Sequence, residues 1–229
     1  MYKNVCGLGA LCHTARFMQR IHVKKTSYPF DWVWTDDTII VDALEDDFKK
    51  FLDKSYYIEP ADKYSDRMCG HSEYHESFFF HKNPRNEDDY QYYQRCVDRF
   101  RTMVKDGESK LFIVMFSPEK TKWPLDLSQM MEEGRDKSEI MEVMKQKGRN
   151  INNALRKVAV NYKLSVIMNF GNNPIQSFNV EHEDGMDFIE LNTLTSSVGV
   201  TFNDGTYTTN QHPDNYFISG LMSELYKFH

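Results

Sequence analysis

One run of seven residues, Lys110–Phe116, limits what this chain can fold into more than any other stretch. It reads Lys-Leu-Phe-Ile-Val-Met-Phe, with no polar residue after the first. A strand with one face in water alternates apolar and polar side chains, whereas an unbroken apolar strand is usually covered on both faces. Because helices on both sides of a parallel sheet provide that cover, the run predicts an α/β fold.

Strand-like and helix-like patterns alternate along the rest of the chain. The expected strands span residues 3–8, 164–170 and 186–191, with a short one at 55–58. The expected helices span residues 12–21, 37–52, 86–104, 138–162 with an interruption near Gly148, and 214–226 with Pro213 in the first turn. Residues 61–81 resemble a loop, and residues 123–135 an irregular insertion. We therefore predict a single α/β domain over residues 1–229, in three layers, with a mostly parallel central sheet and helices on both faces.

The turn after the first strand holds the candidate nucleophile. Gly7, Gly9 and Cys12 stand where that strand should pass into the first helix. Backbone N–H groups and the helix dipole at such a turn favour negative charge, so a cysteine there can become a nucleophilic thiolate. The alternative is a small buried apolar residue, which is how we interpret Cys6. Because Cys12 occupies the place of a third glycine, a dinucleotide-binding loop is excluded.

A cysteine nucleophile needs a base, and two of the eight histidines are candidates. His212 stands just before the last expected helix, where a loop can reach the strand ends. We rank it above His81, which closes the aromatic run 78–80. For either one the alternative is a solvated or structurally bonded imidazole. Asp31 lies between two bulky aromatic residues, so we expect its carboxylate to be desolvated and paired, either with a histidine or with the backbone of its own loop.

Charge and cysteine spacing exclude several functional classes. The net charge of −6 gives no general electrostatic reason to bind nucleic acid or an anionic membrane. The four cysteines lack the spacing of a structural zinc site, so we predict no metal site. Residues 1–4 lead straight into the first strand and no apolar run is long enough to span a membrane. We therefore expect a cytoplasmic protein with reduced thiols and no disulfide framework.

Two motifs together resemble a known family. They are Gly7-Leu8-Gly9-Ala10-Leu11-Cys12-His13-Thr14-Ala15 and Ser27-Tyr28-Pro29-Phe30-Asp31-Trp32. The pair is similar to the opening of a family of papain-like cysteine peptidases found in bacteria and large DNA viruses, in which serine stands at the position of Gly7. Weaker similarity extends through Phe80-His81 and the expected helix at 86–104 to the strand Lys110–Phe116. The resemblance implies a peptidase acting on a peptide or isopeptide bond, in the host cytoplasm if the source is a virus.

Three functional hypotheses follow from these residues. The first is a cysteine-dependent hydrolase without a cofactor, in which Cys12, a histidine and Asp31 converge at the end of the first strand. Its substrate would be a peptide or protein, with contacts from Gly9, His13, Phe30 and Trp32. The second is an SGNH-like esterase, or a coenzyme A-dependent acyltransferase acting on a glycan, because a nucleophile after the first strand and a histidine before the last helix is the layout of those esterases. The third is a catalytically silent binding or host-interaction module.

Overall fold

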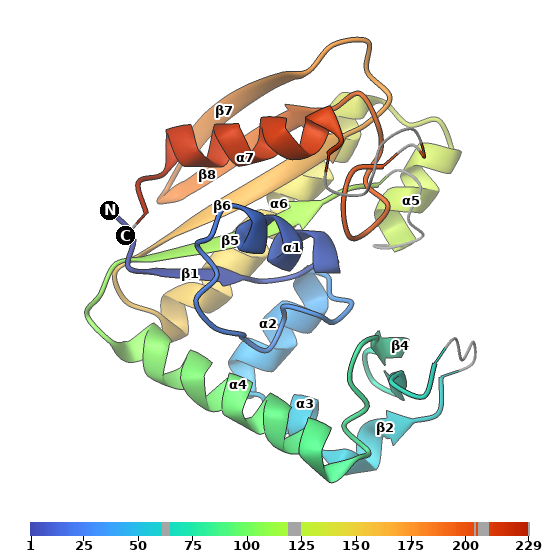
Figure 1. Ribbon diagram of the computed structural model, residues 1–229, viewed down its shortest axis with the longest axis vertical. Helices are drawn as coiled ribbons and strands as arrows, with labels where there is room; N and C mark the ends of the chain where they lie inside the picture. The colour runs from blue at the N-terminus through green and yellow to red at the C-terminus, as the bar shows by residue number, and fades with distance from the viewer. Residues whose placement is uncertain (61–64, 119–124, 204, 206–210, 229) are drawn as a thin grey trace.

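A five-stranded mixed sheet forms the centre of the molecule (Figure 1). The structure is a computed structural model and describes residues 1–60, 65–118, 125–203, 205 and 211–228. The strand order is β1-β5-β6-β8-β7, with the first four strands parallel and β7 antiparallel to β8. The strand bounds are Asn4–Gly7 (β1), Lys110–Phe116 (β5), Tyr162–Phe170 (β6), Ser177–Glu183 (β7) and Met186–Asn192 (β8). The predicted α/β class with a mostly parallel sheet is confirmed.

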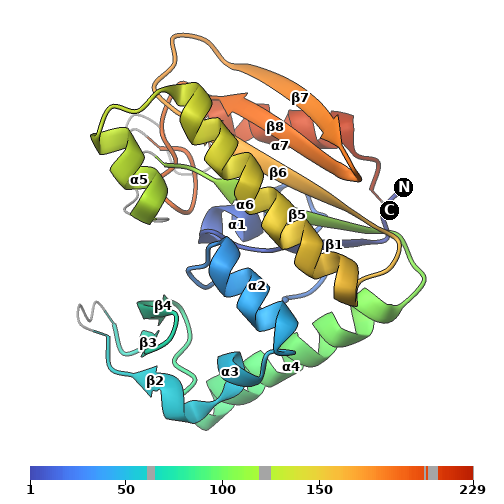
Figure 2. The ribbon, with the colours of Figure 1, turned by 180° about the vertical axis from the view of Figure 1, so that it is seen from behind.

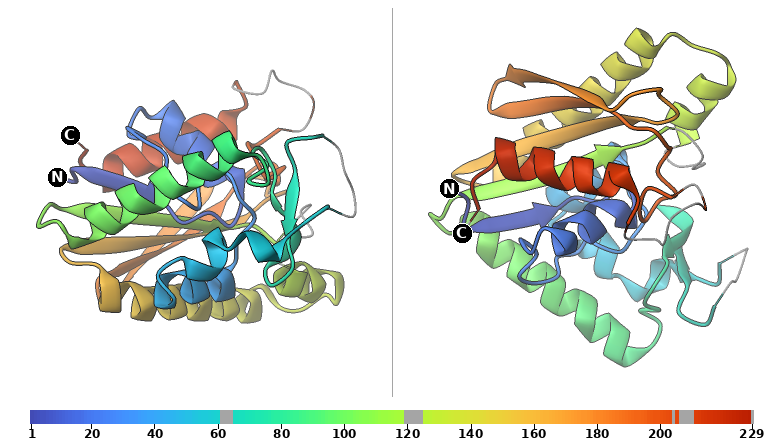
Figure 3. Two further views of the ribbon diagram at one scale, coloured as in Figure 1. Left: turned by 90° about the horizontal axis from the view of Figure 1, so that it is seen from below. Right: turned by 45° about the horizontal axis from the view of Figure 1, so that its top comes forward.

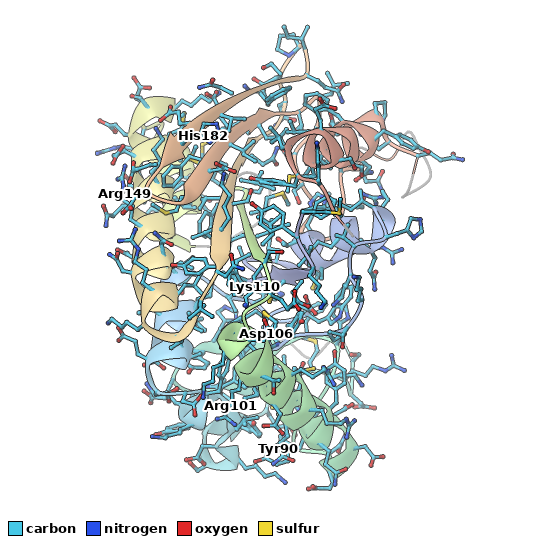
Figure 4. All side chains as sticks on the ribbon, turned by 90° about the vertical axis from the view of Figure 1, so that its left-hand side faces the viewer. Tyr90, Arg101, Asp106, Lys110, Arg149 and His182 are labelled. Atoms are coloured by element: carbon cyan, nitrogen blue, oxygen red, sulfur yellow. The ribbon has the colours of Figure 1, made fainter. Side chains whose placement is uncertain are left out.

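Strand β5 has the covered position that its sequence predicts. All seven of its residues are buried, and β1 and β6 pair with it on either side. Its one charged residue, Lys110, begins the strand and donates to the backbone carbonyls of Asp106, Glu108 and Val160 at 2.6, 2.7 and 3.0 Å. The Lys110 ammonium also lies 2.9 Å from the Asp106 carboxylate, beside the end of helix α4 (Glu87–Lys105; Figure 4). These bonds satisfy a cation that would otherwise be costly to bury.

Alternate residues of the parallel strands enter two separate cores. On one face Val114 and Val166 pack with residues of α2 (Asp37–Glu45) and α6 (Lys137–Val158), which cover the sheet in Figure 2. On the other face Ile113 and Ile167 pack with residues of α1 (Cys12–Arg20) and α7 (Pro213–Leu225), as Figure 1 shows. The predicted helices on both faces are therefore present, and they make three layers.

A second, small sheet lies at the end of the molecule where the parallel strands finish, and both chain termini lie at the opposite end (Figure 3). It consists of the antiparallel strands β2 (Tyr57–Ile58), β3 (Cys69–His71) and β4 (His75–Phe79), and it follows a short helix, α3 (Lys49–Leu52), and a 3₁₀ turn, Lys54–Tyr56. The prediction of a loop over residues 61–81 is wrong for β3 and β4. Phe78 and Phe79 anchor β4, because both are fully buried against the ring of Phe51.

Four other features of the secondary structure differ from the sequence-based expectation. The helix expected to reach residue 52 ends at Glu45, since Asp47 and Phe48 have φ values of 56° and 58° and start a new turn. A helix, α5 (Leu125–Glu132), lies in the segment expected to be irregular. Helix α6 passes Gly148 without interruption, and glycine at this position lets the helix pack closely on the sheet, because a Cβ would lie 2.8 Å from the Val166 side chain. Strand β7 was not expected, and it pairs with β8 across the turn Asp184-Gly185.

Candidate functional site

The turn between β1 and α1 is fixed by one threonine. Gly9 has a φ of +86° and Ala10 a φ of +52°, so the chain takes the left-handed region twice before the helix. The Thr35 hydroxyl donates to the Leu8 carbonyl at 3.1 Å and accepts from the Ala10 N–H at 3.0 Å. A Cβ on Gly9 would lie 2.2 Å from that hydroxyl oxygen. Glycine is therefore required here by both backbone angle and space.

Helix α1 begins at Cys12, which places the sulfur at the positive end of a helix dipole. The residue before it, Leu11, has extended backbone angles, and no side chain caps the first turn of the helix. The first N–H groups of a helix have no partner within it. They can therefore stabilise negative charge that develops next to the sulfur, which is what an oxyanion hole requires.

His81 lies beside this sulfur. Its Nε2 is 3.4 Å from Cys12 Sγ, within hydrogen-bond distance for sulfur. His81 comes two residues after β4, so the small antiparallel sheet carries the imidazole to the start of α1. The Trp32 ring stands edge-on to His81, with ring centroids 5.8 Å apart. Cys12 is only 4% exposed, whereas His81 is exposed, so the imidazole is on the solvent side of the pair.

Both partners of the pair favour their neutral forms. Burial raises the pKa of the Cys12 thiol to about 12, and the charge of Asp31 adds to the rise, against the lowering effect of the residue's own backbone N–H. Desolvation lowers the pKa of His81, and the nearby Arg67 cation lowers it further. The expected acidification of Cys12 by the helix is therefore not what the structure gives. Desolvation outweighs it, so burial favours the thiol form of Cys12 and the neutral form of His81.

A pocket of about 690 Å³ opens next to His81. It collects residues from the loop of Trp32, from the segment before β3 and from the start of α4. Its lining residues are Trp32, Asp66, Arg67, His81, Lys82, Asn86, Asp89 and Tyr92. Lys82 and Asp89 form an ion pair at 2.9 Å, and the Lys82 ammonium lies over the Tyr92 ring at 4.6 Å. The pocket therefore presents aromatic surface together with charges of both signs.

Residues 3–143 match the sequence profile of a family described as "Putative papain-like cysteine peptidase (DUF1796)". The chain belongs to this family. The matched region includes Cys12, Asp31, Trp32 and His81, together with the rest of the pocket, so the resemblance read from the sequence is confirmed. Comparisons with curated proteins and with solved structures give no match.

Within the family motif Pro29-Phe30-Asp31-Trp32, the aspartate has a structural partner rather than a histidine. Asp31 is 1% exposed and forms an ion pair with Lys24, whose ammonium also donates to the Thr26 carbonyl at 2.7 Å. The same carboxylate oxygen accepts from the Tyr28 N–H at 2.7 Å. Asp31 therefore closes its own loop, which was the second of the two roles expected for it. The convergence of Asp31 with the imidazole is not seen.

Three other predicted site residues have contacts elsewhere. His212 caps α7, its Nδ1 accepting from the Asp214 N–H at 3.2 Å, so the ranking of His212 above His81 is opposite to the geometry. His13 is fully buried, with Nδ1 2.7 Å from the Ser197 hydroxyl, and burial lowers its pKa to about 3. Phe30 is also fully buried, and its ring packs against Phe48, Phe51 and Phe100. The locations of His13 and Phe30 in the core favour packing over contact with a substrate.

Arg67, Asn86 and Tyr92 line the pocket and were not singled out from the sequence. Asn86 and Tyr92 lie at the start of α4, a helix that the sequence does predict, and Asp89 lies between them at helical spacing. The helical spacing of these residues was therefore visible in the sequence, but their place in a pocket becomes clear only once β4 is known to bring His81 to Cys12.

Over the described ranges, no group of three or more His, Cys, Asp or Glu residues could hold a metal ion, and no helix is long and apolar enough to cross a membrane. All four cysteines are free thiols.

Proposed function

We propose that this protein is a cysteine-dependent hydrolase in which Cys12 is the nucleophile and His81 the general base. The observation that carries the proposal is the 3.4 Å contact between Cys12 Sγ and His81 Nε2 at the start of a helix. A nucleophile and a base within hydrogen-bond distance, beside a group of N–H donors, is the arrangement that acyl transfer requires. Membership of a family described as cysteine peptidases supports a peptide or isopeptide bond as the substrate.

Because burial favours the neutral form of both groups, proton transfer accompanies nucleophilic attack in the proposed reaction. His81 Nε2 takes the thiol proton as Cys12 Sγ bonds to the carbonyl carbon, and the π electrons of the carbonyl move to its oxygen. The first N–H groups of α1 stabilise that oxyanion. The carbon–nitrogen bond then breaks, and His81 returns the proton to the leaving amine. In the second half, water attacks the thioester carbon while His81 takes its proton. The carbon–sulfur bond then breaks, and His81 returns the proton to the Cys12 sulfur as the product acid is released.

The pocket beside His81 is suited to receive a side chain of the substrate. Its aromatic surface comes from Trp32 and Tyr92, and Trp32 also contacts the imidazole edge-on. A side chain of the substrate that enters the pocket would pack on these rings and exclude water from His81. Asp31 acts indirectly, because its ion pair with Lys24 closes the loop that ends at Trp32.

The geometry supports the two other hypotheses less well. The esterase or acyltransferase layout uses a histidine just before the last helix, but His212 is buried at the cap of α7, bonded to the Asp214 N–H. A silent binding module gives no reason for an imidazole within 3.4 Å of a cysteine at a helix start. No coenzyme A or other cofactor is needed for the proposed reaction.

Peptide turnover tests the proposal directly. The wild-type protein is incubated with a pooled peptide library and new chain ends are identified by mass spectrometry. We expect cleavage by wild type, none by Cys12→Ser, and unchanged cleavage by the matched control Cys96→Ser, which removes another buried thiol. Cleavage that survives Cys12→Ser would refute the assignment of the nucleophile.

A further inference from the structure

A second pocket, of about 370 Å³, lies between α1 and α7, which are side by side on one face of the sheet (Figure 1). Its lining residues are Arg16, Gln19, Arg20 and Tyr216. None of them lines the pocket beside His81. Three come from α1, the helix that begins with Cys12, and Tyr216 comes from the first turns of α7.

The Arg20 guanidinium is held in this pocket by neutral groups. Its Nη1 donates to the Asn215 Oδ1 at 3.1 Å, and its Nη2 donates to the Thr201 hydroxyl at 3.3 Å. The same Asn215 oxygen accepts from the Thr201 hydroxyl at 2.9 Å and from the Phe202 N–H at 3.2 Å. These bonds fix the plane of the guanidinium in advance of any ligand, while its charge is not neutralised by them.

A second positive charge stands beside the first. Arg16 lies close enough to lower the pKa of Arg20, a shift to which the partial burial of Arg20 contributes most. In the part of the chain that the structure describes, neither arginine forms an ion pair with a carboxylate, and Arg16 donates only to the Gln19 side chain, at 3.2 Å. The chain has 34 acidic residues, so a shortage of carboxylates does not explain why these two arginines lack one as a partner. Two adjacent cations that share a pocket are stabilised by an anion between them.

We propose that this pocket is a binding site for a phosphate group. Guanidinium groups match phosphate oxygens with paired N–H donors, and two of them suit a dianion better than a carboxylate. The Gln19 amide and the Tyr216 hydroxyl are further donors in the lining. Tyr216 is 61% exposed, which leaves its ring available to an aromatic or sugar group that carries the phosphate. The ligand is therefore inorganic phosphate or a small phosphate monoester.

The site is independent of the proposed hydrolase activity but lies on the same helix. Arg16 follows Cys12 by four residues, which is about 6 Å along a helix axis. Binding can therefore be measured without any substrate for the cysteine, and its failure would say nothing about Cys12 and His81.

Calorimetric titration of the full chain tests the site. The probes are inorganic phosphate and phenyl phosphate, with chloride at matched ionic strength as the reference. We expect binding of phosphate that Arg16→Gln and Arg20→Gln each weaken at least about tenfold, the loss of one charge-assisted contact. The control Arg95→Gln removes the same charge from an exposed position on α4 and should leave affinity within about twofold.

The outcomes separate the sources and the alternatives. Tighter binding of phenyl phosphate assigns the site to a monoester, and equal or tighter binding of inorganic phosphate assigns it to the free ion. Because Arg20→Gln also removes bonds to Asn215 and Thr201, Arg16→Gln is the deciding variant if the former fails to fold. The proposal is overturned if phosphate does not bind above the chloride reference, or if Arg16→Gln binds it as tightly as Arg95→Gln.

Discussion

Replacing Gly9 with alanine should destabilise the protein far more than the same change at Gly185. Both glycines have left-handed backbone angles, with φ of +86° and +81°. The left-handed conformation costs an alanine about 1–2 kcal/mol, and nothing lies within 4 Å of a Cβ at Gly185, so that cost is the whole effect there. At Gly9 the new Cβ meets the Thr35 hydroxyl oxygen at 2.2 Å and the Phe30 carbonyl oxygen at 3.1 Å.

The difference between the two variants can be worked out from the bonds of Thr35. To make room, its hydroxyl must leave both the Leu8 carbonyl and the Ala10 N–H, at about 1 kcal/mol for each hydrogen bond. Gly9→Ala should therefore lower the free energy of unfolding by about 3–4 kcal/mol, against about 1–2 kcal/mol for Gly185→Ala. Urea denaturation followed by circular dichroism measures both. Equal losses for the two variants would show that Thr35 does not fix the turn before Cys12.

Three further outcomes are expected. Asp31→Asn should lower the free energy of unfolding by about 3–5 kcal/mol, because it leaves the Lys24 ammonium buried without its partner. The double variant Lys24→Met with Asp31→Leu should lose less stability. Equal losses of the two variants in urea denaturation would contradict a buried ion pair. His13 has a folded pKa of about 3 against 6.5, so the unfolded state binds its proton first and stability should fall by up to about 1.4 kcal/mol per pH unit below pH 6.5. His13→Gln should flatten that fall in denaturation curves at pH 7, 6 and 5, and an unchanged slope would show that His13 titrates normally. The alkylation rate of Cys12 by iodoacetamide should keep rising to pH 10, since burial raises its pKa to about 12; a plateau below pH 8 would indicate a thiolate–imidazolium pair instead.

The parallel part of the fold could be predicted from the sequence because the apolar patterns of its strands and helices are local. The run Lys110–Phe116 is a strand with the bounds expected, and the spacing of Tyr93, Val97 and Phe100 predicted α4. The short strand expected at 55–58 is present as β2, but β3 and β4 were missed, since His75-Glu76-Ser77 is polar and β4 is held mainly by the burial of Phe78 and Phe79. Strand β7 was missed for a similar reason. It has little apolar surface, although the Asp184-Gly185 dipeptide is a hairpin signal.

The same difference between local patterns and long-range contacts explains which parts of the candidate site could be predicted. Cys12 could be located because a glycine turn and a helix start are both local patterns. The contact between His81 and Cys12 could not be foreseen without β3 and β4, because those strands carry residue 81 to the start of α1. The partner of Asp31 could not be read either, since nothing in the spacing of Lys24 marks it as buried. Long-range contacts between polar residues leave no periodic pattern in a sequence.

The most direct test of the Cys12–His81 pair is the rate at which Cys12 reacts with a peptide-linked electrophile. Wild type, His81→Gln and His212→Gln are compared at pH 7, with the adduct located by mass spectrometry. A general base contributes about 10²–10⁴-fold. We therefore expect His81→Gln to react at least about a hundred times more slowly than wild type, and His212→Gln to keep the wild-type rate. Wild-type labelling of Cys12 in His81→Gln, or loss of labelling only in His212→Gln, would contradict the assignment of His81 as the base.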